Sequence, residues 1–322
     1  MGIRLGRNGR QQGAGAQRRR GGGIKWWVLI AFAAFAAWRW FGSAETDPYT
    51  GETAHYAATP DEEVQLGAQA YQQVLGDASA QGALVDPSDP VSLQVRAIAS
   101  RLVDRVPQVS ADLAARNQQQ VPDSWHGFQW DVSVIDSEQA NAFCLPGGKM
   151  AVYTGLLPVT RNDDALAVVM GHEIAHALLR HGSQRLAQQE LVQLGQVAAA
   201  VAVSDADPQR QQMVMGALGA GAQYGLILPY GRNHESQADQ VGLMLAAAAC
   251  YDPREAIGLW ERMSAAGGAA PPEFASTHPD PANRIARLQQ LMPEALEFHQ
   301  RYCGGASAAE TPRAVSGRPA SG

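Results

Sequence analysis

The sequence predicts an α+β fold that is mainly helical and contains a small β-sheet. Apolar residues recur at helical spacing over several long segments, while two shorter segments, 128–136 and 149–154, have the pattern of strands. Of the 322 residues, 46% are apolar and 17% are charged, which is the balance of a globular protein. We expect one domain over residues 59–303.

The N-terminal residues are strongly basic. The first 25 residues carry seven Arg or Lys and no acid, whereas the rest of the chain carries 18 basic and 31 acidic residues. An acidic body argues against binding to nucleic acid, whose phosphates attract positive charge. Residues 1–23 are also rich in Gly and Gln, and we expect them to form a disordered arm.

A membrane segment follows the basic arm. Residues 24–42, IKWWVLIAFAAFAAWRWFG, are about long enough to cross a bilayer, and tryptophans stand at both ends. We expect an uncleaved transmembrane anchor. The alternative is a signal peptide, because the uncharged centre has only 13 residues and small residues follow at Gly42-Ser43-Ala44. Residues 43–58 are then a linker.

The charge distribution predicts the orientation of the chain. By the positive-inside rule the basic arm stays in the cytoplasm and the body lies across the membrane. In a Gram-negative bacterium this is a single-pass inner-membrane protein with a periplasmic domain, or a periplasmic protein if the segment is cleaved. Three cysteines are too few for a disulfide framework. An oxidising compartment permits a Cys250–Cys303 bridge, but we expect buried free thiols.

Local signals place the elements along the chain. A helix begins at the Thr59 cap with Pro60 in the first position, and a second runs over 89–106 with the same start signals. Residues 128–136 alternate between apolar and polar, and 149–154 form a short strand after a Pro-Gly-Gly turn. Further helices are predicted over residues 162–182, 184–203, 233–250, 253–265 and 281–291.

Two segments lack a clear helical or strand pattern. Residues 213–228 are uncharged and rich in Gly, which we interpret as a packed or mobile flap, with membrane contact as the lesser alternative. Residues 304–322 contain too few apolar side chains to bury, so we expect a disordered tail.

The segment MGHEIAHALLRHG contains the order His-Glu-x-x-His. His172 and His176 lie one helical turn apart on one face, which suits a tetrahedral Zn²⁺ that takes two imidazole nitrogens. Glu173 lies about 100° further round the helix. It cannot replace either ligand, but it suits a general base that acts on water beside the metal.

A catalytic zinc site needs a third protein ligand. The metzincin pattern requires Gly at position 179 and His at position 182, and the chain has neither. The gluzincin pattern takes a Glu from a later helix and an Asp four residues on, and HESQAD supplies Glu235 and Asp239 at that spacing. Two other glutamates are weaker alternatives, because neither has an Asp four residues later: Glu255 and Glu261.

Four motifs occur in order: NAFCLPGGKMAVYTGLL, HEIAHALLRH, PYGRNHESQAD and STHPDPANRI. Over residues 60–295 the chain resembles the membrane-associated zinc metallopeptidases of peptidase family M48, which include HtpX, the CAAX prenyl proteases and the Oma-type enzymes. It looks like a minimal, singly anchored bacterial form with a gluzincin-type domain. The resemblance implies one Zn²⁺ held by His172, His176 and Glu235, with Glu173 as general base and Asp239 behind a ligating histidine.

The resemblance also implies roles around the metal. His278 matches a histidine that lies near the zinc and acts as a fourth ligand in a resting state, where it would gate activity. His278 or Arg284 is a candidate donor to the oxygen that becomes negative during the reaction. An edge strand that pairs with extended substrate is expected at Lys149, Met150, Ala151, Val152 and Tyr153.

These features predict a zinc endopeptidase, and the family resemblance implies that it hydrolyses unfolded or damaged envelope proteins. The alternative is a membrane-tethered chaperone that uses the same cleft without cleavage, but such a binder has no need of Glu173. His181 and His234 are interpreted as polar helix residues rather than ligands, because both are rotated away from the predicted metal face. Cys144 is interpreted as a small buried residue rather than a zinc contact.

Overall fold

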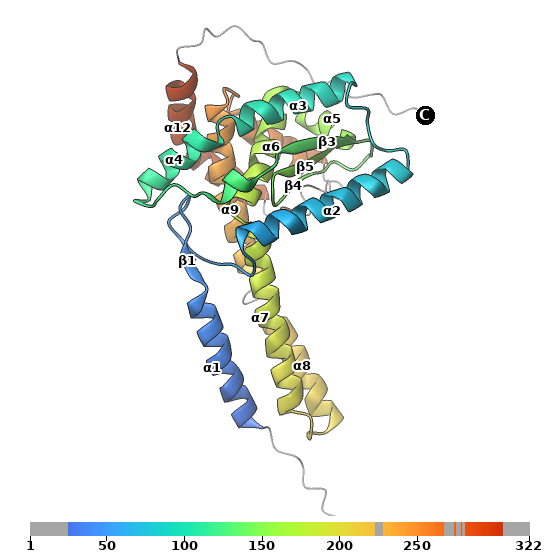
Figure 1. Cartoon of the computed structure of the whole chain (residues 1–322), viewed down its shortest axis with the longest axis vertical. Helices are drawn as coiled ribbons and strands as arrows, with labels where there is room; N and C mark the ends of the chain where they lie inside the picture. The colour runs from blue at the N-terminus through green and yellow to red at the C-terminus, as the bar shows by residue number, and fades with distance from the viewer. Residues whose placement is uncertain (1–24, 223–227, 267–273, 275–277, 279–280, 305–322) are drawn as a thin grey trace, which may run out of the picture.

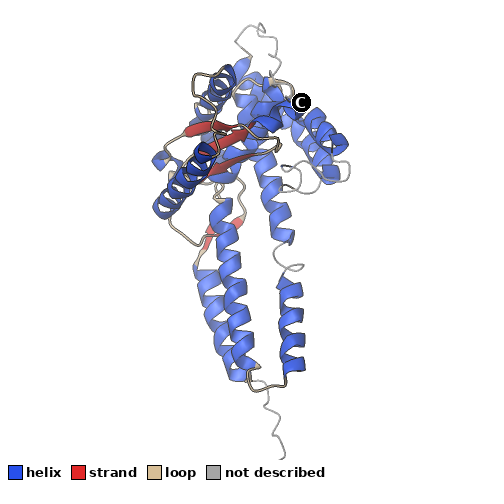
Figure 2. Ribbon diagram, turned by 90° about the vertical axis from the view of Figure 1, so that its right-hand side faces the viewer, coloured by secondary structure: helices blue, strands red, loops and turns tan. Residues whose placement is uncertain are grey.

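The computed structural model describes residues 25–222, 228–266, 274, 278 and 281–304. The predicted arm over 1–23 and the predicted tail beyond residue 304 lie outside the described residues. The described chain is mainly helical, with a three-stranded sheet and a separate two-stranded hairpin, so the predicted α+β class is confirmed (Figures 1 and 2).

The three-stranded sheet has the order β3–β5–β4 and consists of β3 (Asp131–Ile135), β4 (Ala142–Leu145) and β5 (Lys149–Tyr153). β5 runs parallel to β3 and antiparallel to β4. The β4–β5 turn uses Gly147 and Gly148 at φ of 81° and 78°, where glycine avoids the strain that other residues incur. The predicted edge position of Lys149–Tyr153 is therefore wrong: β5 is central, and the short strand β4, which was not predicted, is an edge.

Helix α6 (Asp163–Leu178) lies at the centre of the body and packs against α9 (Leu228–Ala248). It begins where Asn162 accepts a 2.8 Å hydrogen bond from the Ala165 amide. The two helices touch through glycines: a Cβ atom on Gly171 would lie 2.8 Å from the Gly242 oxygen, and one on Gly242 would lie 2.6 Å from the His172 nitrogen. This close approach brings Glu235 and Asp239 of α9 within reach of His172.

Helix α6 ends four residues before the predicted end at residue 182. Arg180 adopts the left-handed conformation at φ 56°, and α7 (His181–Ala202) begins directly after it. The Arg180 side chain holds this break, because it pairs with Glu63 at 2.6 Å and lies over the Tyr56 ring at 3.9 Å. His181 therefore belongs to the first turn of a new helix with a different direction.

The N-terminal helices of the body begin as predicted. In α2 (Pro60–Ala80) the Thr59 hydroxyl accepts from the Glu62 amide and the Glu62 carboxylate accepts from the Thr59 amide, a reciprocal cap. The helix predicted over 89–106 is α3 (Pro90–Val103), and a further helix that was not predicted, α4 (Val106–Arg116), follows it. Other described elements of the body are η1 (Ser124–Gly127), η2 (Thr154–Leu156), α5 (Leu157–Thr160), α10 (Glu255–Ala266) and α12 (Pro281–Cys303).

Three helices project from one side of the body (Figures 1 and 2): α1 (Trp26–Gly42), α7 and α8 (Pro208–Ala222). α1 packs along α7. Within the described ranges, no helix combines the length and the apolar character that a bilayer crossing requires. The predicted linker, residues 43–58, contains the hairpin of β1 (Ala44–Thr46) and β2 (Thr53–His55), and its Tyr49 is buried in the core. Residues 223–227 of the predicted flap lie outside the described residues.

Cys250 and Cys303 form a disulfide between the ends of α9 and α12, with 5.6 Å between their Cα atoms. The expectation of free thiols is wrong for this pair and right for Cys144, which is free and buried. Spacing along the chain could not reveal the bridge, because the two helices become neighbours only in the folded protein. Closing a loop of 53 residues restricts the unfolded chain and stabilises the fold by about 4 kcal/mol.

Candidate metal centre

Side chains from α6, α9 and the segment before α12 converge on one point. His172, His176, Glu235 and His278 each offer a ligand atom, and these atoms lie within 4.8 Å of one another. The two α6 histidines point the same way, with 3.0 Å between their Nε2 atoms. The sequence predicts that His172 and His176 lie one helical turn apart on one face, and this spacing brings both imidazoles to the same site.

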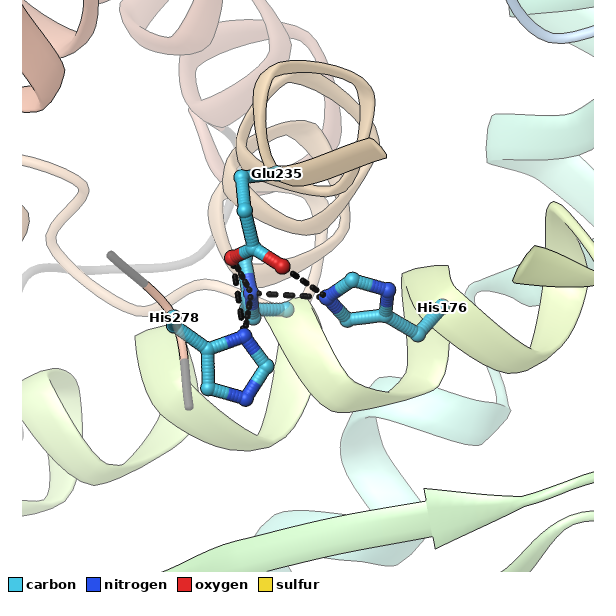
Figure 3. Close-up of side chains that lie close together, drawn as sticks. His176, Glu235 and His278 are labelled. Atoms are coloured by element: carbon cyan, nitrogen blue, oxygen red, sulfur yellow. Dashed lines mark hydrogen bonds and ion pairs between the residues drawn. The ribbon is translucent and has the colours of Figure 1, made fainter. Parts of the chain in front are cut away.

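The Glu235 carboxylate lies among the three rings, and Figure 3 shows it between His176 and His278. Its Oε2 atom is 2.8 Å from His278 Nδ1 and 3.3 Å from His172 Nε2, and its Oε1 atom is 3.5 Å from His176 Nε2. Burial alone would raise the pKa of Glu235, but the hydrogen bonds from His172 and His278 hold it well below its usual value. Glu235 is therefore an anion.

The donor set fits a divalent cation that prefers nitrogen together with oxygen. Three imidazole nitrogens and one carboxylate are ligands that Zn²⁺ takes in tetrahedral sites. Burial and the neighbouring His172 and His181 place the pKa of His176 well below its usual value, so this ring is neutral and offers a lone pair. The alternative glutamates lie elsewhere: Glu255 pairs with Arg262, and Glu261 is exposed.

Asp239 and Arg284 support the ligands from behind. Asp239 Oδ1 lies 3.1 Å from His172 Nδ1, the ring nitrogen that faces away from the cluster. Arg284, only 2% exposed, donates to Asp239 at 2.6 Å and to Glu235 at 3.0 Å, with its guanidinium 3.9 Å from the centre of the Trp260 ring. The guanidinium neutralises these two buried carboxylates, and its Nη2 atom also lies 2.8 Å from His172 Nδ1 and 3.0 Å from His172 Nε2.

Glu173 lies on the open side of the cluster. The side chain is buried, and its Oε1 atom is 3.4 Å from His278 Nε2. Burial raises the pKa of Glu173, and the positive charge available on His278 and His172 partly opposes this effect. A carboxylate with a raised pKa is a better proton acceptor than an ordinary one.

A cleft of about 260 Å³ leads to Glu173. β4 and its turn form one wall, and the end of α6 and the start of α7 form the other. Cys144 lines this cleft, but its sulfur lies outside the ligand cluster, and burial raises the pKa of its thiol. Lys149–Tyr153 are absent from the described lining, because β5 lies behind β4.

The structure brings two further histidines close to the cluster. His181 Nδ1 is 2.8 Å from His176 Nδ1, and the His181 ring stacks on His234 with 4.1 Å between ring centres. The sequence interpretation treated both as polar helix residues. It extended α6 to residue 182 and so rotated His181 away from the metal face, and it placed His234 about 100° round its helix from Glu235. A local signal for the break at Arg180 is lacking, since its partner Glu63 is 117 residues away.

Comparisons with known proteins agree with this geometry. Residues 103–292, more than half of the chain, match the profile of Peptidase family M48. Mitochondrial metalloendopeptidase OMA1 of Schizosaccharomyces pombe is 33% identical over 84% of this chain and 72% of its own length. Metalloendopeptidase OMA1 of Danio rerio is 31% identical over 86% and 61%, and the beta-barrel assembly-enhancing protease of Escherichia coli is 28% identical over 81% and 50%. The chain thus spans half to about three quarters of these relatives.

Proposed function

Because the chain belongs to peptidase family M48, it is a metalloendopeptidase, and we propose that it uses one Zn²⁺ to cleave unfolded or damaged polypeptides. One observation carries the proposal: His172, His176 and Glu235 converge beside Glu173 at the inner end of a cleft. The name of the Escherichia coli relative supports a role in quality control of the cell envelope.

The residues of the site have different roles in peptide hydrolysis. His172, His176 and Glu235 would hold the Zn²⁺, whose Lewis acidity would polarise a substrate carbonyl and make water easier to deprotonate. Glu173 takes the proton from the attacking water and returns it to the leaving amine. Asp239 accepts a hydrogen bond from His172 Nδ1 and so keeps the Nε2 lone pair directed at the cluster.

Substrate binds along β4 rather than along β5. The Tyr153 amide donates to the Asn141 oxygen, so in this antiparallel pair the backbone groups of Ala142 and Cys144 point away from β5. Among the described residues no strand pairs with that side of β4. An extended peptide can add there through main-chain hydrogen bonds, which favours unfolded substrates of varied sequence.

We expect the purified full-length chain to hydrolyse casein, to lose this activity on treatment with a zinc chelator, and to regain it when Zn²⁺ is restored. Zinc content and cleavage products are measured in the same samples. Cleavage that persists after zinc is removed would contradict the proposal. Binding of zinc and casein without any cleavage would instead identify a chaperone that has the fold of a peptidase.

His278 closes the metal site in a resting state. Its Nδ1 atom lies with the ligand atoms of the cluster, and its Nε2 atom faces Glu173, so the ring fills the space that water needs. His278→Ala should therefore raise the rate of casein hydrolysis, by about tenfold if the closed state makes up about 90% of the molecules. The exposed His126→Ala variant is the control. Loss of activity in His278→Ala would assign this histidine to catalysis instead of gating.

The N-terminal helix associates with the bacterial inner membrane and leaves the body in the periplasm. Large apolar side chains of α1 are exposed, including Trp27 at 71% and Phe41 at 76%, and such side chains favour the membrane interface. Exposed apolar residues on the neighbouring α7, such as Val197, extend this surface. The Cys250–Cys303 disulfide agrees with an oxidising compartment.

A further inference from the structure

A chain of polar side chains, buried at His181 and Gln237 and exposed at Glu52, leads away from the metal cluster on the far side of His176. The contacts run from His176 Nδ1 to His181 Nδ1 at 2.8 Å, from His181 Nε2 to Gln237 Oε1 at 2.9 Å, and from Gln237 Nε2 to Glu52 Oε2 at 2.7 Å. His181 is 1% exposed and Gln237 is 8% exposed. None of these partners belongs to the ligand cluster, and none is used in the mechanism above.

We propose that His181 is a positioning residue for the metal ligand His176, and that Gln237 and Glu52 fix the ring nitrogen on which His181 carries its proton. The proposal rests on the proposed zinc function. His181, Gln237 and Glu52 would together hold His176 in the tautomer that leaves the Nε2 lone pair free to bind metal.

The allocation of protons follows from the contacts in order. His176 directs Nε2 at the cluster, so this nitrogen must keep its lone pair and the proton must sit on Nδ1. His176 then donates to His181 Nδ1, which leaves the His181 proton on Nε2, where it is donated to Gln237 Oε1. The Gln237 amide group donates in turn to Glu52, a carboxylate that only accepts. Each group in this series thus fixes whether the group before it donates or accepts the hydrogen bond.

Helix α9 therefore supports both histidine ligands as well as providing one ligand itself. Asp239 contacts Nδ1 of His172, and Gln237 contacts His181, which in turn contacts His176. An outer partner fixes the orientation of a ligating imidazole and strengthens its bond to metal. Because Glu52 lies between β1 and β2, this chain of contacts also ties the metal site to the hairpin that follows α1.

The test compares three variants of the full-length chain. His181→Leu removes the acceptor, while His181→Asn restores an oxygen that can accept from His176 Nδ1. Gln188→Leu is the matched control, since Gln188 is 3% exposed and lies two turns further along α7, outside this chain of contacts. Zinc affinity is measured by competition with a chelator, and thermal unfolding without metal reports on the fold.

We expect His181→Leu to weaken zinc binding by about 10-fold to 100-fold, the range for loss of an outer partner. His181→Asn and Gln188→Leu should bind zinc nearly as well as wild type. Long-range ¹H–¹⁵N spectra of the metal-free protein should show the His176 proton on Nδ1 in wild type. In His181→Leu they should show a mixture of the Nδ1 and Nε2 tautomers.

Two results would overturn the inference: unchanged zinc affinity in His181→Leu, or an equal loss in Gln188→Leu. If His181→Leu does not fold, the affinity of His181→Asn and the His176 spectrum of wild type decide the question. Failure of the wild type to bind zinc would instead refute the proposed function.

Discussion

Glu173→Gln should lower the rate of casein hydrolysis by between about 100-fold and 10,000-fold while the chain still binds one zinc ion. The amide has nearly the shape of the carboxylate but cannot take a proton from water. Glu173 is buried on the open side of the cluster and lies outside the ligand set, so its replacement removes no metal bond. The measurements are the cleavage rate and the zinc content of the same preparation.

Glu190→Gln is the control for this variant, because Glu190 lies exposed on α7. It should cleave casein at the wild-type rate. A Glu173→Gln variant that remains active would place the general base elsewhere. A variant that loses zinc together with activity would show that Glu173 holds the metal site together instead of acting on water.

A second large loss of activity is expected when the carboxylate ligand Glu235 is replaced. Glu235→Gln should weaken zinc binding by more than about 100-fold, beyond the loss expected for an outer partner, and peptidase activity should fall with it. The substitution removes the only negative charge among the four grouped donors and leaves the Arg284 guanidinium with one anionic partner fewer. Buried charge that loses its partner is strongly unfavourable, so the metal-free protein should also be less stable.

Glu261→Gln separates this ligand from the alternative that the sequence left open. Glu261 is exposed on α10, and its variant should bind zinc and cleave casein as wild type does. Zinc affinity by chelator competition and the unfolding temperature without metal are measured for both variants. A larger loss of zinc in Glu261→Gln than in Glu235→Gln would contradict the site described above.

The disulfide and the acidic pair connect the same two helices. Glu235 and Asp239 lie on α9, Arg284 lies near the start of α12, and Cys250–Cys303 joins the C-terminal ends of these two helices. The buried arginine and the covalent bridge therefore hold α9 and α12 together at two separate points. This arrangement keeps the third ligand in place against α6, where two glycines already bring the backbones into contact.

The sequence by itself determined the features that depend on neighbouring residues. The cap at Thr59 formed as predicted, and the helix expected from residue 162 begins there with Asn162 as its cap, because a cap needs only the next three residues of the chain. Helical periodicity placed His172 and His176 on one face, and the same spacing placed Glu235 and Asp239 on one face of α9. The helical character and the small sheet followed from the same local patterns.

Only the tertiary structure decided which elements become neighbours. The four-residue strand β4 forms an edge of the sheet where β5 was expected, because β5 pairs with β3 on one side and with β4 on the other. Arg180 ended α6 through contacts with Glu63, and this turned His181 toward His176. The packing of α12 on α9 places Cys303 beside Cys250 and Arg284 beside Glu235 and Asp239. The contacts of Arg180 with Glu63, of Cys250 with Cys303 and of Arg284 with its two acids join residues 45 to 117 positions apart, and no local pattern encodes such a separation.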